Sequence, residues 1–67
     1  MKIERVSAGR FVIDASEDDL LVLNNALNEV CNGLPIRDFE TRIGMPLGFA
    51  ESMLREVSEA LDSDAAH

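Results

Sequence analysis

The residues of this sequence that could do chemistry are few, and the densest group of them is acidic. Glu17, Asp18 and Asp19 directly follow Ser16, so a helix here would carry three carboxylates in its first turn. A serine before several acids is also the usual start of a helix, because serine caps free backbone N–H groups and acids favour the positive end of the helix dipole. We therefore interpret the cluster as structural and expect neither a metal site nor a catalytic site there.

Nucleophilic catalysis would lack a base. The single histidine, His67, is the last residue, and Cys31 is the single cysteine. A serine or cysteine nucleophile needs a positioned imidazole, and a structural zinc site needs a cluster of such ligands. The four glycines lie near expected element boundaries rather than in a phosphate-binding loop. We predict a protein that is not an enzyme and uses no cofactor.

Length and charge restrict the remaining function classes. The chain has 67 residues, enough for one domain, and a formal net charge of −7. Nucleic acid and anionic lipid repel such a chain, so a charge-steered partner should be basic. No apolar run reaches the roughly 20 residues of a membrane span, and the first residues lack a signal-peptide hydrophobic region. Together with the lone cysteine, this predicts a cytoplasmic protein.

The elements that must position these residues are two strands and three helices. Residues 2–15 contain the β-branched segments KIERV and RFVIDA on either side of Ser7-Ala8-Gly9, which predicts a β-hairpin. Apolar periodicity predicts helices over about 17–31, 36–43 and 47–61, followed by a frayed tail at 62–67. The predicted fold is a compact single domain of the α+β class, in the order ββααα.

Each expected helix has one apolar face. The three faces comprise Leu20, Leu23, Leu27, Val30 and Cys31 in the first helix, Ile36, Phe39 and Ile43 in the second, and Ala50, Met53, Leu54, Val57 and Leu61 in the third. Pro35 is expected in the first turn of the second helix. Asn32-Gly33 and Gly44 are expected to end the first and second helices.

Asparagine is frequent on the first helix. Asn24, Asn25 and Asn28 each cost up to about 0.7 kcal/mol of helix propensity relative to alanine, so the folded or bound state should use their amides. They border Leu21, which falls outside the main apolar face. Either the hairpin or the last helix covers Leu21, or Leu21 and the amides form an interface. The candidate residues for partner contact are Leu21, Asn24, Asn25, Asn28, Arg5 and Phe11.

The small size of the chain also favours a second copy. A chain of this length buries only about 60% of the surface that its unfolded form exposes, and an isolated two-stranded hairpin is marginal in water. A disulfide within the chain is excluded because Cys31 is the only cysteine. We therefore expect a homodimer.

Residues 36–58 support an alternative function. The segment IRDFETRIGMPLGFAESMLREV has the order of a helix-turn-helix DNA-binding motif: a short helix, a glycine turn and a second helix. However, Glu40 stands where the motif usually has a small residue, and the second helix offers Glu51, Glu56 and Glu59 with only Arg55 as a cation. DNA phosphates would be repelled by this surface, so a DNA-binding regulator is the less favoured alternative.

Three segments within residues 19–61 resemble a pattern in small uncharacterised bacterial proteins, some of which look like immunity proteins that neutralise secreted toxins. These segments are DLLVLNNALNEVCNG, DFETRIG and AESMLREVSEAL. The resemblance implies a non-enzymatic bacterial protein that acts in the cytoplasm by protein–protein interaction. A basic nuclease toxin would then be a partner suited to the acidic chain.

Overall fold

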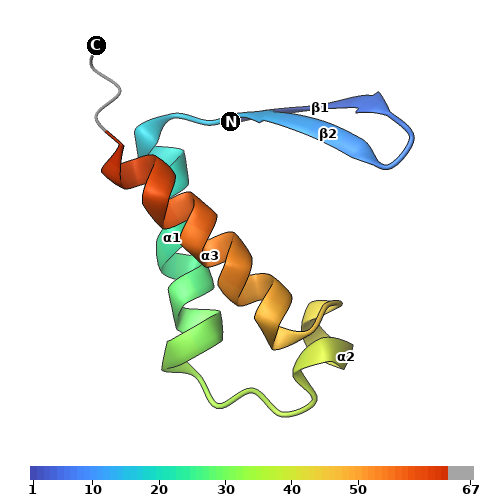
Figure 1. Ribbon diagram of the computed structural model, residues 1–67, viewed down its shortest axis with the longest axis vertical. Helices are drawn as coiled ribbons and strands as arrows, with labels where there is room; N and C mark the ends of the chain where they lie inside the picture. The colour runs from blue at the N-terminus through green and yellow to red at the C-terminus, as the bar shows by residue number, and fades with distance from the viewer. Residues whose placement is uncertain (64–67) are drawn as a thin grey trace.

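The computed structural model describes residues 1–63 and has the predicted α+β fold (Figure 1). The elements in chain order are β1 (Lys2–Ser7), β2 (Arg10–Asp14), α1 (Glu17–Asn28), the π-helical turn η1 (Glu29–Gly33), α2 (Phe39–Ile43) and α3 (Leu47–Asp62). The predicted order of two strands and three helices is confirmed. Most of the expected frayed tail, residues 64–67, lies outside the described residues, while Asp62 belongs to α3.

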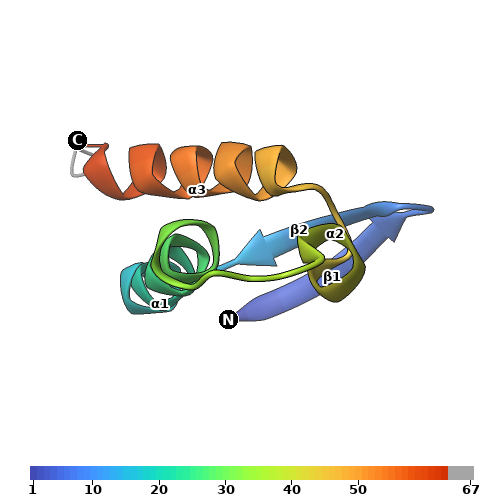
Figure 2. The same ribbon diagram turned by 90° about the horizontal axis from the view of Figure 1, so that it is seen from below.

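The body of the fold is the pair α1 and α3, which lie side by side and run in opposite directions (Figures 1 and 2). The residues facing each other are those of the predicted apolar faces: Leu20, Leu23 and Leu27 on α1, and Leu54, Val57 and Leu61 on α3, all half-buried. Ala50 is 5% exposed and is the one buried apolar side chain among residues 1–63; the others are half-buried or exposed. The core is therefore a single seam between two helices.

Two side chains expected inside are exposed. Met53 is 42% exposed and Ile43 is 44% exposed. Because α1 is the only long helix against α3, it covers just one strip of the α3 surface, and Met53 lies beside that strip. Ile43 ends the short α2, whose other apolar residues, Ile36 before it and Phe39 within it, are half-buried.

The first helix ends differently from the prediction. Its α-helical part stops at Asn28, and the chain makes one π-helical turn, closed by the Leu34 N–H donating to the Glu29 carbonyl at 2.9 Å. This turn ends at Gly33, so the helical segment ends at Asn32-Gly33 as expected, but Gly33 is not in the left-handed conformation that usually ends a helix. A Cβ atom at position 33 would meet the Glu29 carboxylate, which is the end of an exposed side chain and can move aside.

The second helix is shorter than predicted. It begins at Phe39 rather than at residue 36, because Asp38 adopts a left-handed backbone (φ 51°, ψ 50°) that cannot continue into a right-handed helix. Pro35 consequently lies in the preceding loop and not in a first helical turn. The predicted end of this helix is confirmed, since Gly44 has φ 98° and its N–H donates to the Glu40 carbonyl at 2.8 Å.

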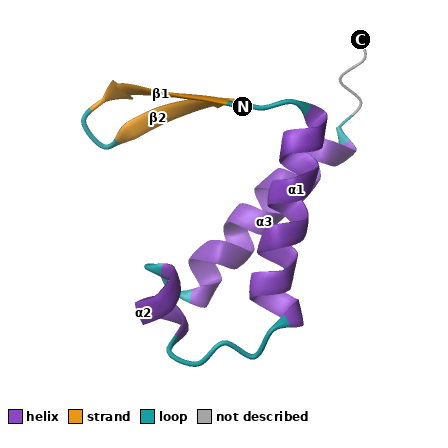
Figure 3. Cartoon of the chain, turned by 180° about the vertical axis from the view of Figure 1, so that it is seen from behind, coloured by secondary structure: helices purple, strands orange, loops and turns teal. Residues whose placement is uncertain are grey.

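The β-hairpin turns at Ala8-Gly9, as predicted, with Gly9 at φ 76°. It projects away from the helices, and every residue of both strands is exposed (Figure 3). Its projection contributes to a radius of gyration of 13.4 Å, above the about 11 Å expected for a globular chain of this length. Within residues 1–63, neither strand has extensive contact with a helix.

Candidate functional site

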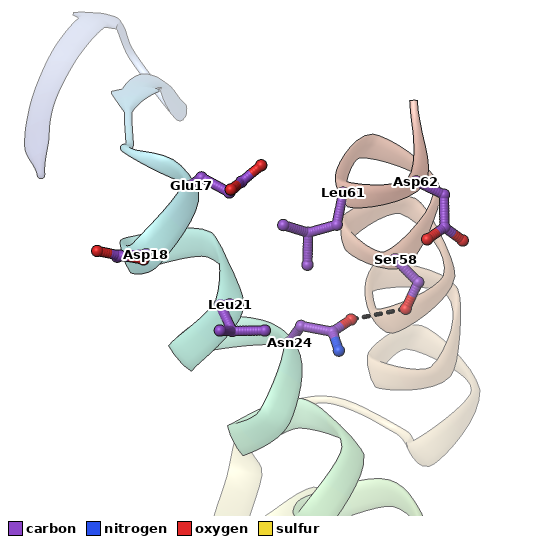
Figure 4. Close-up of a pocket in the computed structure, with 7 residues that line it drawn as sticks. All are labelled: Glu17, Asp18, Leu21, Asn24, Ser58, Leu61 and Asp62. Atoms are coloured by element: carbon purple, nitrogen blue, oxygen red, sulfur yellow. Dashed lines mark hydrogen bonds between the residues drawn. The ribbon is translucent and has the colours of Figure 1, made fainter. Parts of the chain in front are cut away.

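A groove of about 460 Å³ lies between the start of α1 and the end of α3 (Figure 4). Its lining consists of two leucines, one amide, one hydroxyl and three carboxylates, from Glu17, Asp18, Leu21, Asn24, Ser58, Leu61 and Asp62. Glu17 and Leu61 extend into the space between the helices from opposite sides, whereas Asp18 points away from α3 (Figure 4). The lining therefore combines two leucines with three carboxylates, which we call the acidic rim, and has no cation; of these carboxylates, Glu17 extends into the space between the helices.

The start of α1 fixes the acidic rim in place. Ser16 and Asp19 form a reciprocal capping box: the Asp19 N–H donates to the Ser16 hydroxyl at 3.1 Å, and the Ser16 N–H donates to the Asp19 carboxylate at 3.0 Å. The pKa of the Asp19 carboxyl is lowered, first by that Ser16 backbone N–H and then by the Met1 amino group, which lies 3.2 Å from the carboxylate. Because the cap uses only Asp19, Glu17 and Asp18 stay at the groove.

A hydrogen bond joins the two walls of the groove. The Ser58 hydroxyl donates to the Asn24 amide oxygen at 2.6 Å, and both residues are partly buried (Figure 4). Asn24 thus has a use inside the folded chain that offsets its poor helix propensity. Asn28 also has an internal partner, since its amide oxygen accepts a hydrogen bond from Asn32 at 3.0 Å. Asn25 is exposed.

The position of Leu21 answers the question of what covers it. Its side chain is 48% exposed and lines the groove, and the hairpin does not reach it. Leu21 therefore lies partly at the surface and is not the core residue that the first of the two sequence-based interpretations describes. Its contact with a partner stays a prediction.

The six predicted contact residues fall into two groups. Leu21 and Asn24 line the groove, and Asn25 and Asn28 lie on the same helix without lining it. Arg5 and Phe11 are directly opposite each other in the hairpin, where the Arg5 guanidinium carbon stacks 4.4 Å from the centre of the Phe11 ring. The hairpin pair therefore belongs to a separate surface.

Five groove residues were missed as site residues from the sequence. Glu17 and Asp18 were explained by the helix start, Leu61 by the core and Asp62 by the frayed tail, and Ser58 was not singled out. Their spacing carries a signal: positions 17, 21 and 24, and positions 58, 61 and 62, each form one side of a helix. That signal becomes useful only when the end of α3 is known to lie beside the start of α1.

The structure also bears on metal binding, membrane insertion and DNA binding. Among residues 1–63, no three histidine, cysteine, aspartate or glutamate side chains gather as metal ligands would, and no helix has the length and apolarity to cross a membrane. The order α2, Gly44, α3 matches the helix-turn-helix prediction, and α3 exposes Glu51 and Glu56 beside Arg55. DNA binding stays a prediction, which a binding assay at low salt would reject if no complex forms.

Comparison with protein families, curated proteins and solved structures gives no match to this chain. The function proposed below is accordingly supported by the groove, the charge and the sequence alone.

Proposed function

We propose that this chain is a non-enzymatic protein-binding domain whose groove between α1 and α3 binds a basic, partly apolar segment of a partner protein. The observation that carries the proposal is the groove lining, in which the exposed Leu21 is found together with three acidic residues and no basic one. The net charge of −7 acts in the same direction, because it attracts a basic partner before contact.

Lysine and arginine side chains have the chemistry that fits this lining. Their aliphatic stems can lie on Leu21 and Leu61, while their charged ends reach the carboxylates of the rim. Asp62 is the last residue of α3, where the unpaired carbonyl groups and the negative end of the helix dipole add to its charge. A cation at this end of the groove would therefore meet both a carboxylate and backbone carbonyls.

An immunity-type role is the specific form of this proposal that the sequence resemblance supports. In that role, the partner would be a basic toxin, and the acidic groove would cover part of its positively charged surface. The resemblance supplies this partner class. The groove supplies only the expectation that the contacting segment is basic and partly apolar.

The groove can be tested with a fluorescein-labelled peptide of alternating lysine and leucine, measured by fluorescence anisotropy at about 0.15 M salt, where the Debye length is about 8 Å. The variant Glu17→Gln/Asp18→Asn/Asp62→Asn should weaken binding on the order of tenfold. A control with the same change in net charge, Glu40→Gln/Glu51→Gln/Glu56→Gln, should change the affinity less than about threefold, because distant charges are screened.

Two results would contradict the proposal. Equal weakening by both triple variants would mean that the peptide responds only to net charge. Amide chemical shifts that move on the hairpin, and not around Leu21, Asn24 and Leu61, would place the peptide elsewhere. Circular dichroism of both variants checks that α1 still forms, since Glu17 and Asp18 also stabilise its first turn.

A further inference from the structure

The outer edge of β2 is an unpaired strand edge. Within residues 1–63 the sheet has two strands, so β2 pairs with β1 on one side and with nothing on the other. Two-stranded hairpins are marginal in water, and three or more strands with an apolar face are needed for independent stability. Exposed strand edges are also the usual template for pairing with another chain. This hairpin, which no helix covers, therefore lacks the neighbours that such a sheet needs.

The two faces of the hairpin differ in chemistry. The cross-strand pairs Ile3–Ile13 and Arg5–Phe11 place Ile3, Phe11 and Ile13 on one face, with Arg5 stacked on the Phe11 ring. These three apolar side chains are 57%, 52% and 55% exposed, respectively. The pairs Lys2–Asp14 and Glu4–Val12 make the other face mostly polar. A partner strand must keep these faces aligned, because a shift of one residue would place apolar side chains among polar ones.

The sequence of β2 is complementary to itself. When two β2 strands pair antiparallel about Val12, Arg10 of each copy lies opposite Asp14 of the other, Phe11 lies opposite Ile13, and Val12 meets Val12. All five residues of the strand (Arg10–Asp14) are used. Opposite charges and aromatic–aliphatic pairs directly across an antiparallel ladder are both favourable. The same pairing keeps Phe11 and Ile13 of both copies on one face.

The edge of β1 is a poorer candidate. Antiparallel pairing of two β1 strands about Glu4 or about Arg5 places two like charges directly opposite each other, which is unfavourable. Pairing about Ile3 avoids that repulsion but engages only residues 2–4. The register shift between Arg5 and Ser7 also interrupts the β1 strand, and such bulges discourage edge pairing.

We propose that two copies of this chain pair through the outer edges of β2, about a two-fold axis at Val12, to form a four-stranded antiparallel sheet in the order β1-β2-β2-β1. The interface uses the same residues on both copies, as a two-fold dimer requires. It is separate from the groove, so dimerisation and binding of a basic segment can fail independently.

The test reverses one charge at a time in the proposed interface and measures the dimer Kd by sedimentation equilibrium. In Arg10→Asp, two carboxylates face each other twice per dimer; in Asp14→Arg, two guanidinium groups do. Each variant should raise the dimer Kd on the order of tenfold. An equimolar mixture of the two variants should recover a dimer at least as tight as the wild type, because every charged pair between the different copies is then opposite in sign.

The mixture separates an interface from a folding effect. If Arg10 and Asp14 mattered only within each hairpin, mixing two damaged chains would recover nothing. Charge-matched controls outside the hairpin are Arg37→Asp for the first variant and Glu51→Lys for the second, and both should keep the wild-type Kd within about threefold. A wild-type chain that stays monomeric at about 100 µM, or a mixture no tighter than its components, would overturn the proposal.

Discussion

The helical pair and the hairpin of this chain respond to the same problem, a shortage of core, in opposite ways. α1 and α3 bury their apolar faces against each other along one seam, and Ala50 of α3 is the most buried side chain among residues 1–63. The hairpin has an apolar face of similar kind, formed by Ile3, Phe11 and Ile13, and leaves it in water. Both regions have regular secondary structure, yet only the helices have tertiary packing.

This difference shows that a segment of a small chain can form regular secondary structure without being buried. The apolar pattern of each segment and its turn residues suffice to form helices and a hairpin. Burial needs a second surface, and α3 supplies one for α1 while no part of residues 1–63 supplies one for the hairpin. The packing of the helices should therefore determine the free energy of unfolding, and the hairpin should determine whether two copies assemble. The following predictions test that division.

The largest expected effect is at the helical seam. Ala50→Asp would bury a carboxylate at a position that is 5% exposed. An unpaired buried charge should cost about 3 kcal/mol or more, which is most of the stability of a domain this small. Urea unfolding followed by far-ultraviolet circular dichroism would measure the loss. The control is Ala60→Asp, the same change at an exposed site of α3, and equal losses would show that the seam is not the core.

A smaller effect is expected from the hydrogen bond that crosses the groove. Asn24→Ala and Ser58→Ala each remove one partner of the 2.6 Å bond and also gain helix propensity, so the single variants underestimate it. A double-mutant cycle isolates the pair, and we expect a coupling free energy of about 1 kcal/mol. Asn25→Ala is the comparison, because its gain in helix propensity should stabilise the chain by up to about 0.7 kcal/mol. A coupling free energy near zero would mean that this hydrogen bond gives Asn24 no structural role.

The capping box at the start of α1 predicts a pH dependence of stability. The folded pKa of Asp19 is lowered, so its stabilising effect is fully present above about pH 4 and is lost as the pH falls through that lowered pKa. Unfolding free energies measured between pH 7 and pH 3 should decline less steeply for Asp19→Asn than for the wild type. Asp18→Asn, outside the capping box, should retain more of the wild-type slope. Parallel curves for wild type and Asp19→Asn would contradict the assignment.

The smallest effect is expected at the hairpin. Ile13 is 55% exposed in the chain, so Ile13→Ser should change the unfolding free energy of the helices by less than about 0.5 kcal/mol at concentrations where the chain is monomeric. The measurement is the urea midpoint of the helical signal in dilute solution. A loss comparable to that of a core substitution would mean that the hairpin folds back onto the helices, and the contrast between the two regions would disappear.

The sequence predicts local features better than distant ones, for a physical reason. The Ser16 start of α1, the Gly9 turn and the Gly44 stop depend on neighbouring residues, and all three are confirmed. The predicted start of α2 at residue 36 was wrong, because a left-handed backbone at Asp38 has no clear signature in the residue types around it. Similarly, the π-helical turn after Asn28 arises from a local change of hydrogen-bond partner that apolar periodicity does not reveal.

The groove was only partly predictable because it joins segments far apart in the chain. Leu21 and Asn24 stood out on the first helix as residues without an obvious role, and both line the groove. Ser58 did not stand out, since a serine on a helix has many explanations until a partner 34 residues earlier is found beside it. The pairing of α1 with α3 is the information that the sequence pattern alone did not contain.

The separation of Asn24 from Ser58 also affects how the chain acquires its structure during synthesis. The two partners of this hydrogen bond are 34 residues apart, and the helix that supplies Ser58 is the last element of the fold. Closing such a long loop must precede any gain from the seam. While a ribosome is still adding residues 47–62, the first helix has no surface to pack on, and an isolated helix of its length is marginal. The nascent chain should therefore stay open until α3 has been synthesised, and its helices should then fold together in one step.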